Sequence, residues 1–135
     1  MFRDPYVPTP WAEIAGMLSR ADIAPGCRVL DVGSGDGRLV IASAALGADA
    51  TGIELDAELV RKSRARIAVR HPALLSRTTI IEGDYMAASW RDYDVILLHI
   101  ADAADMTQKF DAECRRTARL VRRVAAHVFA VQTHA

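Results

Sequence analysis

The chain has no apolar run long enough to cross a membrane, and its 17 basic and 17 acidic residues leave no net charge. Without a long-range field to attract nucleic acid or acidic lipid, we expect neither nucleic acid nor a membrane as a partner. Cysteine is scarce: Cys27 and Cys114 have no C-x-x-C spacing and no paired histidines. We therefore expect reduced thiols and no metal site. Residues 1–5 lack the basic-then-apolar layout of a signal peptide, which predicts a cytoplasmic protein.

Hydrophobic residues, by contrast, make up 51% of the 135 positions, enough for the core of one domain of common size. We predict a single domain over residues 1–135, with an arm and helix in 1–25 and a sheet core in 26–135. Basic residues cluster within 61–70 and 115–123. No aromatic platform of the kind that binds single strands is interleaved with them. We interpret both clusters as solvated helix faces.

Strand and helix patterns alternate along the chain. Strand patterns cover 28–32, 49–54, 78–82, 93–99 and 124–131, and helical patterns cover 9–24, 38–46, 57–71 and, as one broken or two short helices, 102–121. Such alternation builds a parallel sheet with helices on both faces. The sequence therefore predicts an α/β fold with a doubly wound, mostly parallel sheet.

A glycine-rich turn follows the first strand, where residues 31–37 read Asp-Val-Gly-Ser-Gly-Asp-Gly. A dinucleotide site has the spacing G-x-G-x-x-G and places a pyrophosphate at the start of the next helix. Here the spacing is G-x-G-x-G, and the acids Asp31 and Asp36 would repel a pyrophosphate. The turn suits a ligand that carries positive charge at this point. A nicotinamide-dependent oxidoreductase is the less favoured alternative.

Further polar residues follow the other predicted strands. The second strand ends in Glu54, and one carboxylate can accept hydrogen bonds from two ribose hydroxyls at once. The first strand ends at Gly33, the third near Asp84 and the fourth near His99. Because the carboxyl ends of parallel strands meet at one edge of the sheet, these residues predict a single nucleoside site.

These motifs carry a resemblance to a known family. Residues 28–38 resemble motif I of the class I, Rossmann-like methyltransferases, and residues 52–56 resemble their motif II. Two further segments are Tyr-Val-Pro-Thr-Pro at 6–10 and Arg-Val-Ala-Ala-His-Val-Phe at 123–129. The order of these four motifs along the chain is similar to that in the archaeal broad-specificity protein lysine methyltransferases and their mitochondrial relatives. The resemblance implies S-adenosyl-L-methionine as cofactor and methyl transfer to an acceptor amine, first of all protein lysine. A small-molecule acceptor and a cofactor-binding domain without activity are the alternatives.

The resemblance also implies which residues contact the cofactor. The turn would surround the methionine part, Asp31 would hold its ammonium, and Glu54 would hold the ribose. Leu55 would pack on the adenine, Asp84 would accept from its amino group and Tyr85 would flank the ring, although Gly-Asp-Tyr is also an ordinary turn sequence. The full set is Asp31, Gly33, Gly35, Gly37, Glu54, Leu55, Asp84 and Tyr85.

Two residues are candidates for the acceptor side. Tyr6 and the Pro-Thr-Pro segment would cover the cofactor and form the entrance for a target lysine, while also starting a helix. His99 follows the fourth strand and is either a base near the acceptor or simply hydrogen-bonded. The sequence at 98–102, Leu-His-Ile-Ala-Asp, lacks the Asn/Asp-Pro-Pro-Tyr/Phe motif of nucleic-acid amino methyltransferases. It also departs from the Leu-Leu-Pro/Thr pattern expected for the lysine family.

The predicted sheet is shorter than that of most class I methyltransferases, which usually carry two more strands after the fifth as an antiparallel hairpin. The fifth predicted strand ends at Val131, near the last residue, Ala135. We therefore expect the last two of the usual seven strands to be missing. The exposed edge that this leaves invites pairing with another chain, which predicts a homodimer.

Overall fold

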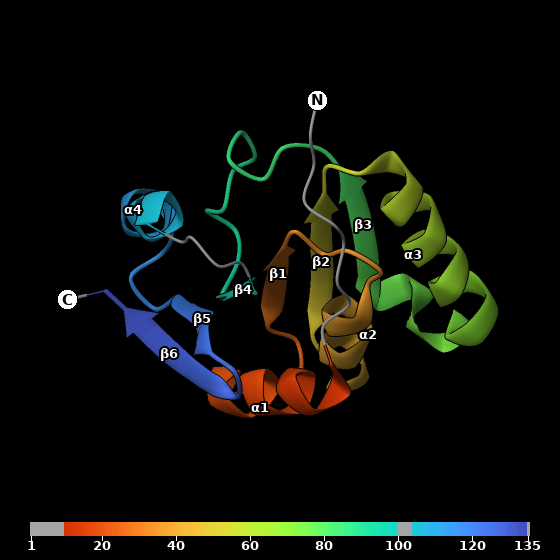
Figure 1. Cartoon of the computed structure of the whole chain (residues 1–135), viewed down its shortest axis with the longest axis horizontal. Coiled ribbons are helices and arrows are strands. Elements are labelled where there is room, and N and C mark those ends of the chain that lie inside the picture. Colours follow the sequence, from red (N-terminus) through yellow and green to blue (C-terminus); the bar gives the residue numbers. More distant parts are fainter. Residues whose placement is uncertain (1–9, 100–103, 135) are drawn as a thin grey trace.

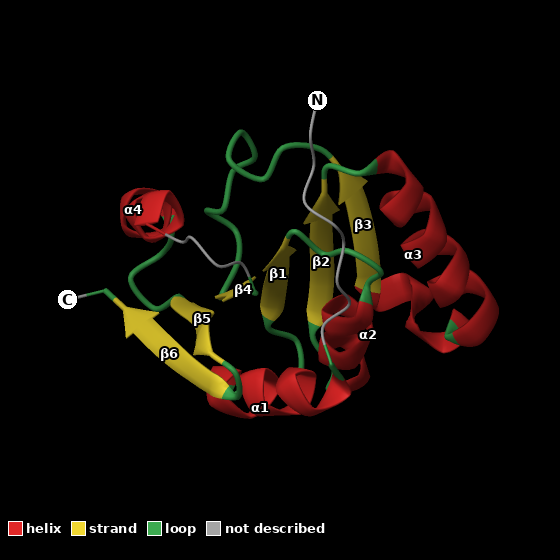
Figure 2. Cartoon of the chain, viewed as in Figure 1, coloured by secondary structure: helices red, strands yellow, loops and turns green. Residues whose placement is uncertain are grey.

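The structure is a computed structural model that describes residues 10–99 and 104–134. Its sheet has six strands in the order β3-β2-β1-β4-β5-β6, with helices on both faces (Figures 1 and 2). In chain order the elements are α1 (Trp11–Ala21), β1 (Arg28–Val32), α2 (Arg38–Ala45), β2 (Asp49–Glu54), α3 (Ala57–Arg70), the 3₁₀-helix η1 (Pro72–Arg77), β3 (Thr78–Glu82), β4 (Val95–Leu98), α4 (Ala104–Glu113), β5 (Arg119–Ala125) and β6 (Val128–Thr133). Within the described part of the chain, no helix is long and apolar enough to span a bilayer.

Strand β1 lies at the centre of the sheet and pairs in parallel with β2 on one side and β4 on the other. The chain runs outward from β1 to β2 and β3, and then returns to place β4 on the opposite side of β1. Such a reversal of strand order opens a crevice at the carboxyl ends of the strands. The register sets Asp31 beside Gly52 of β2 and Leu97 of β4. Asp31 therefore lies at the mouth of this crevice.

Each face of the sheet has its own core, because successive side chains of a strand point to opposite faces. Helices α1 and α2 cover one face, and the buried residues there include Ile14, Met17, Val29, Leu39, Leu97 and Phe129. Helix α4 covers the other face, where the buried residues include Leu30, Trp90, Ile96, Met106, Phe110 and Leu120. Apolar packing on both faces fixes the central strands, so the loops at their carboxyl ends rest on a rigid base.

The predicted fold class is confirmed, and the first three strands have the predicted bounds. The fourth strand is shorter than predicted, at Val95–Leu98, and helices α1, α2 and α3 lie within the predicted ranges. Asp56 caps α3 as an acid at this position can, since its Oδ1 accepts from the N–H groups of Glu58 and Leu59 at 2.9 and 3.4 Å. Pro10 is the N-cap of α1.

The prediction of one strand over 124–131 is wrong. The segment forms a hairpin in which β5 and β6 pair in antiparallel fashion, with a left-handed residue, His127, at its turn (φ 58°). Part of β5 falls in the range 102–121 that was assigned to helix, because Leu120 and Val121 also fit a helical stripe. We expected both strands after the fifth to be missing. The structure has one of them, the antiparallel strand β6.

Candidate active site

The glycine-rich turn after β1 has three residues in the left-handed region, with φ of 72° at Gly33, 57° at Gly35 and 87° at Gly37. Other residues are strained in this region, so the turn requires glycine. The N–H groups of Gly33 and Ser34 donate to the carbonyl oxygen of Ile53 at 2.9 and 3.1 Å. The turn is thereby fixed to the end of β2.

Gly52 allows β2 to approach this turn closely. A Cβ at Gly52 would lie 2.5 Å from Ser34 Cβ, 2.6 Å from Ser34 Oγ and 2.8 Å from Val40 Cγ2. Such distances are too short for any side chain, so the glycine of the Gly-Ile-Glu-Leu-Asp motif is a packing requirement. Because Glu54 follows two residues later on the same strand, the close approach also sets the distance between Glu54 and the turn.

Asp31 is the most unusual titratable residue of the site. It is 2% exposed, and its Oδ1 has no hydrogen-bond partner within the described part of the chain. Burial, followed by the nearby charges of Glu54 and Asp36, raises the pKa of Asp31 well above its ordinary value. A buried carboxylate is unfavourable without a partner, and a bound cation would supply one. The site therefore fits the ammonium of a methionine group.

Glu54 is held with both carboxylate oxygens in defined places. Its Oε1 accepts from the Gly35 N–H at 2.8 Å, and its Oε2 accepts from the Asp56 N–H at 2.9 Å. A carboxylate has about four lone-pair positions, so each oxygen keeps one for a ligand. The geometry is compatible with a ribose whose two hydroxyls donate to Glu54.

Asp84 and Tyr85 follow β3 at the same edge of the sheet. The Gly83 N–H donates to the carbonyl oxygen of Glu54 at 3.0 Å, which joins this loop to β2. Asp84 is exposed, and its Oδ1 accepts from the Met86 N–H at 2.9 Å. Tyr85 is half-buried; burial, then the charges of Asp84 and Glu54, raises the pKa of its phenol.

Leu55 is 69% exposed beside this loop. Large apolar side chains are more often buried than exposed, and an adenine packed on Leu55 would cover it. The structure thus brings Leu55 to the edge where the resemblance places the adenine.

Asp36, the other acid of the turn, points to arginine side chains. Its Oδ2 lies 3.0 Å from Arg38 Nε and 3.7 Å from a terminal nitrogen of Arg66. These ion pairs join the turn to α2 and α3. Asp36 therefore has a structural role.

His99 lies just beyond β4, and its Nε2 is 2.7 Å from Oε2 of Glu13, a buried residue of α1. Oε1 of Glu13 also accepts from Arg123 Nε at 3.1 Å and from the His127 N–H at 3.2 Å. Burial alone would raise the pKa of Glu13, but the hydrogen bonds from His99, His127 and Arg123 lower it to about 2. His99 is therefore oriented by a carboxylate that is charged at neutral pH.

Sequence reasoning missed Glu13, although it orients a candidate residue. The helical pattern marks Trp11, Ile14, Ala15 and Leu18 as the apolar stripe, and an acid next to such a stripe ordinarily faces solvent. The sequence around Glu13 does not indicate its partners, because His99, Arg123 and His127 lie far along the chain.

Tyr6, the second candidate for the acceptor side, lies outside the described residues. Across residues 10–99 and 104–134, no group of three or more His, Cys, Asp or Glu is arranged to hold a metal ion. Cys27 and Cys114 are both free thiols.

Similarity to solved structures defines the class of protein. The chain matches an RNA methyltransferase from Salinibacter ruber in complex with S-adenosyl-L-homocysteine, with a TM-score of 0.78 and 28% identity over 86% of this chain and 76% of that one. A SAM-dependent methyltransferase from Thiobacillus denitrificans, also in complex with S-adenosyl-L-homocysteine, has the same fold, with a TM-score of 0.73 and 20% identity over 84% of this chain and 48% of that one. The protein is a class I methyltransferase, and its cofactor is S-adenosyl-L-methionine.

The family can be stated more narrowly. Residues 31–135 match the ANTKMT methyltransferase domain, and the chain belongs to this family. It is 25% identical to a protein-lysine N-methyltransferase of Saccharolobus islandicus over 130 residues, which cover 95% of this chain and 78% of the relative. It is 45% identical to a Xenopus laevis lysine N-methyltransferase, named for a subunit of ATP synthase, over 62 residues, which cover 46% of this chain and 27% of that relative.

Proposed function

We propose that the protein transfers the methyl group of S-adenosyl-L-methionine to the side-chain amine of lysine in a protein acceptor. The observation that carries this proposal is the match to the archaeal protein-lysine N-methyltransferase, because it extends over 95% of the chain. The frog relative, also a lysine N-methyltransferase by name, gives a second match of higher identity over a shorter stretch. A small-molecule acceptor and a domain that binds the cofactor without transfer are the competing possibilities.

The roles that we propose for the residues follow from the geometry at the sheet edge. The cofactor, when bound, supplies an activated methyl group on a sulfonium, so the protein mainly has to align that group with the acceptor. Asp31 would neutralise the methionine ammonium, and Glu54 would hold the ribose. The turn at Gly33–Gly37 has three residues with positive φ, which glycine adopts because it has no Cβ.

His99 is the candidate to take the proton from the acceptor. A lysine amine has an ordinary pKa of about 10.4 and must be neutral to attack a methyl group. Because ionised Glu13 can only accept a hydrogen bond, the proton at this contact lies on His99 Nε2. In a neutral ring Nδ1 is then the acceptor, and it is the atom that would take a proton from the amine.

The test uses radiolabelled S-adenosyl-L-methionine with a lysine-rich protein, a fully lysine-acetylated copy of that protein, free lysine and a structured RNA. We expect label in the unmodified protein and none in its acetylated copy, with mass spectrometry locating the methyl group on lysine. Label in free lysine or RNA alone would overturn the protein acceptor. Cofactor binding without transfer to any of the four would favour the domain without activity.

A further inference from the structure

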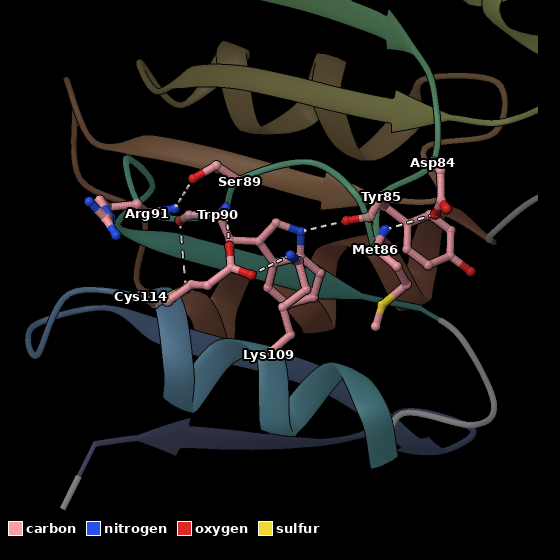
Figure 3. A network of polar contacts seen from close by, with 9 residues as sticks. Asp84, Tyr85, Met86, Ser89, Trp90, Arg91, Lys109 and Cys114 are labelled. Atoms are coloured by element: carbon pink, nitrogen blue, oxygen red, sulfur yellow. Dashed lines mark hydrogen bonds and ion pairs between the residues drawn. The ribbon is translucent and has the colours of Figure 1, made fainter.

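The loop that carries Asp84 and Tyr85 also contains a buried tryptophan. Trp90 is 0% exposed, and its Nε1–H donates to the carbonyl oxygen of Tyr85 at 2.9 Å (Figure 3). The loop between β3 and β4 contains turns and bends but no helix or strand. Its conformation near Asp84 therefore depends on contacts of this kind.

The last turn of α4 holds Trp90 in place through its backbone and its ring. The Trp90 N–H donates to Oε1 of Glu113 at 3.0 Å, and Cys114 Sγ lies 3.6 Å from the Trp90 carbonyl oxygen. The Lys109 ammonium forms an ion pair with Glu113 and lies 5.4 Å from the centroid of the indole ring (Figure 3). Burial alone would raise the pKa of Glu113, but hydrogen bonds from Lys109 and the Trp90 N–H lower it, so this carboxylate is charged.

The two oxygens of Glu113 have different partners. Oε1 accepts from the Trp90 N–H, and Oε2 pairs with the Lys109 ammonium. The Lys109 side chain is 10% exposed and the Glu113 side chain 31% exposed, so the pair is partly removed from water. Glu113 is the last residue of α4, where a negative charge opposes the helix dipole, and its lowered pKa shows that Lys109 and the Trp90 N–H outweigh this cost. The pair therefore fixes the direction of the groups it holds, and here it holds Trp90.

We propose that Lys109 and Glu113 are positioning residues that act through Trp90 to hold Asp84 and Tyr85 against the adenine of the cofactor. The pair then determines how well the site distinguishes adenine from other bases, because recognition of the exocyclic amino group depends on the placement of Asp84. This inference rests on the use of S-adenosyl-L-methionine and on the adenine contact proposed for Asp84. It is independent of the acceptor.

The experiment compares two ligands by titration calorimetry. They are S-adenosyl-L-homocysteine and S-inosylhomocysteine, in which an oxo group replaces the amino group of adenine. The variants are Glu113→Gln, which weakens the ion pair, and Trp90→Phe, which removes the indole N–H but keeps a ring. Asp84→Asn tests the direct contact. Lys62→Met, which removes the only other lysine of the chain from an exposed site on α3, is the control.

We expect Glu113→Gln and Trp90→Phe to weaken the binding of S-adenosyl-L-homocysteine about tenfold, the effect of roughly one hydrogen bond. The affinity for S-inosylhomocysteine should change less than twofold. Asp84→Asn should reduce the preference for adenine at least as much, and Lys62→Met should leave it unchanged. Circular dichroism of each variant confirms that it is folded. A general loss of structure would weaken the binding of both ligands equally.

Two results would overturn the inference in different ways. If Asp84→Asn alone reduces the preference for adenine, Lys109 and Glu113 do not position the loop. If Asp84→Asn leaves the preference intact, the adenine contact on which the inference rests is wrong. Absence of binding of either ligand to the folded wild-type protein would contradict the proposed function itself.

Discussion

His99 and Glu13 are separated by 86 residues in the sequence, yet His99 Nε2 lies 2.7 Å from Glu13 Oε2. The contact joins the carboxyl end of β4 to the first turn of α1. Arg123 of β5 and the His127 N–H of the hairpin turn converge on the same carboxylate. One buried side chain therefore connects the start of the first helix, a central strand and the last two strands.

Acid should weaken the fold through Glu13. The pKa of Glu13 is lowered from an ordinary 4.5 to about 2 in the folded protein. A depressed pKa stabilises the fold above the unfolded value, and this contribution is lost as the pH falls from 4.5 toward 2. The shift corresponds to a loss on the order of 3 kcal/mol. We expect urea unfolding to show that Glu13→Gln is much less stable than wild type at pH 6, and that the difference shrinks at pH 3.

The exposed acid Glu58 provides a matched control for this measurement. Glu58 pairs with Arg61 on the surface of α3, and exposed ion pairs contribute little to stability. The free energy of unfolding of Glu58→Gln should therefore depend on pH in the same way as that of the wild type. A difference between Glu13→Gln and wild type that stays constant from pH 6 to pH 3 would contradict the proposed charge of Glu13.

Gly52→Ala should destabilise the protein and impair cofactor binding together. The new Cβ would lie 2.5 Å from Ser34 Cβ, so β2 or the glycine-rich turn must move. Overpacking of this kind costs typically about 1–3 kcal/mol, and the movement separates Glu54 from the turn. Gly83→Ala is the control, because its Cβ would meet only Ile53 Cδ1 at 3.9 Å. Thermal unfolding checks the prediction, which fails if the two variants melt at the same temperature.

Cofactor binding should depend on pH through Asp31. Burial and the facing acids Glu54 and Asp36 raise the pKa of Asp31 in the free protein. A bound ammonium favours the ionised form, so binding lowers this pKa and releases a proton wherever the free carboxyl is protonated. Affinity should then increase as the pH rises through the raised pKa. Calorimetry in buffers with different ionisation enthalpies measures the released proton, and Asp31→Asn should release none.

His99→Asn should separate catalysis from cofactor binding. If Nδ1 takes the proton of the acceptor, kcat should fall by roughly 10²-fold, at the lower end for general base catalysis. The Kd for S-adenosyl-L-homocysteine should not change. His127→Asn is a suitable control, because Glu13 contacts the backbone of His127 and asparagine tolerates its left-handed conformation. An unchanged kcat in His99→Asn would show that His99 is not a base and only forms its hydrogen bond to Glu13.

Local sequence was enough to predict the part of the fold that builds the cofactor site. Strand β1 is a short apolar run followed by glycine, the pattern of a parallel strand buried on both faces, and β2 and β3 each end in a glutamate. The hairpin was missed because its turn, Ala126-His127, contains neither glycine nor asparagine, the usual signals of a tight turn. An apolar run interrupted only by Ala-Ala-His resembles a single strand.

The contacts around Glu13 and Trp90 could not be predicted in the same way. The partners of Glu13 lie 86 to 114 residues away, and Glu113 lies 23 residues from Trp90. Such pairs depend on which elements the fold brings together. Sequence periodicity reports the face on which a residue lies and says nothing about its partner on another element.

The most direct test of the cofactor site is titration calorimetry of the protein with S-adenosyl-L-methionine, beside the variants Asp31→Ala and Glu54→Ala. We predict micromolar binding to the wild type. Binding should be lost in both variants, because one removes the partner of the ammonium and the other removes the partner of the ribose. Failure of the folded wild-type protein to bind, or full affinity in either variant, would contradict this account.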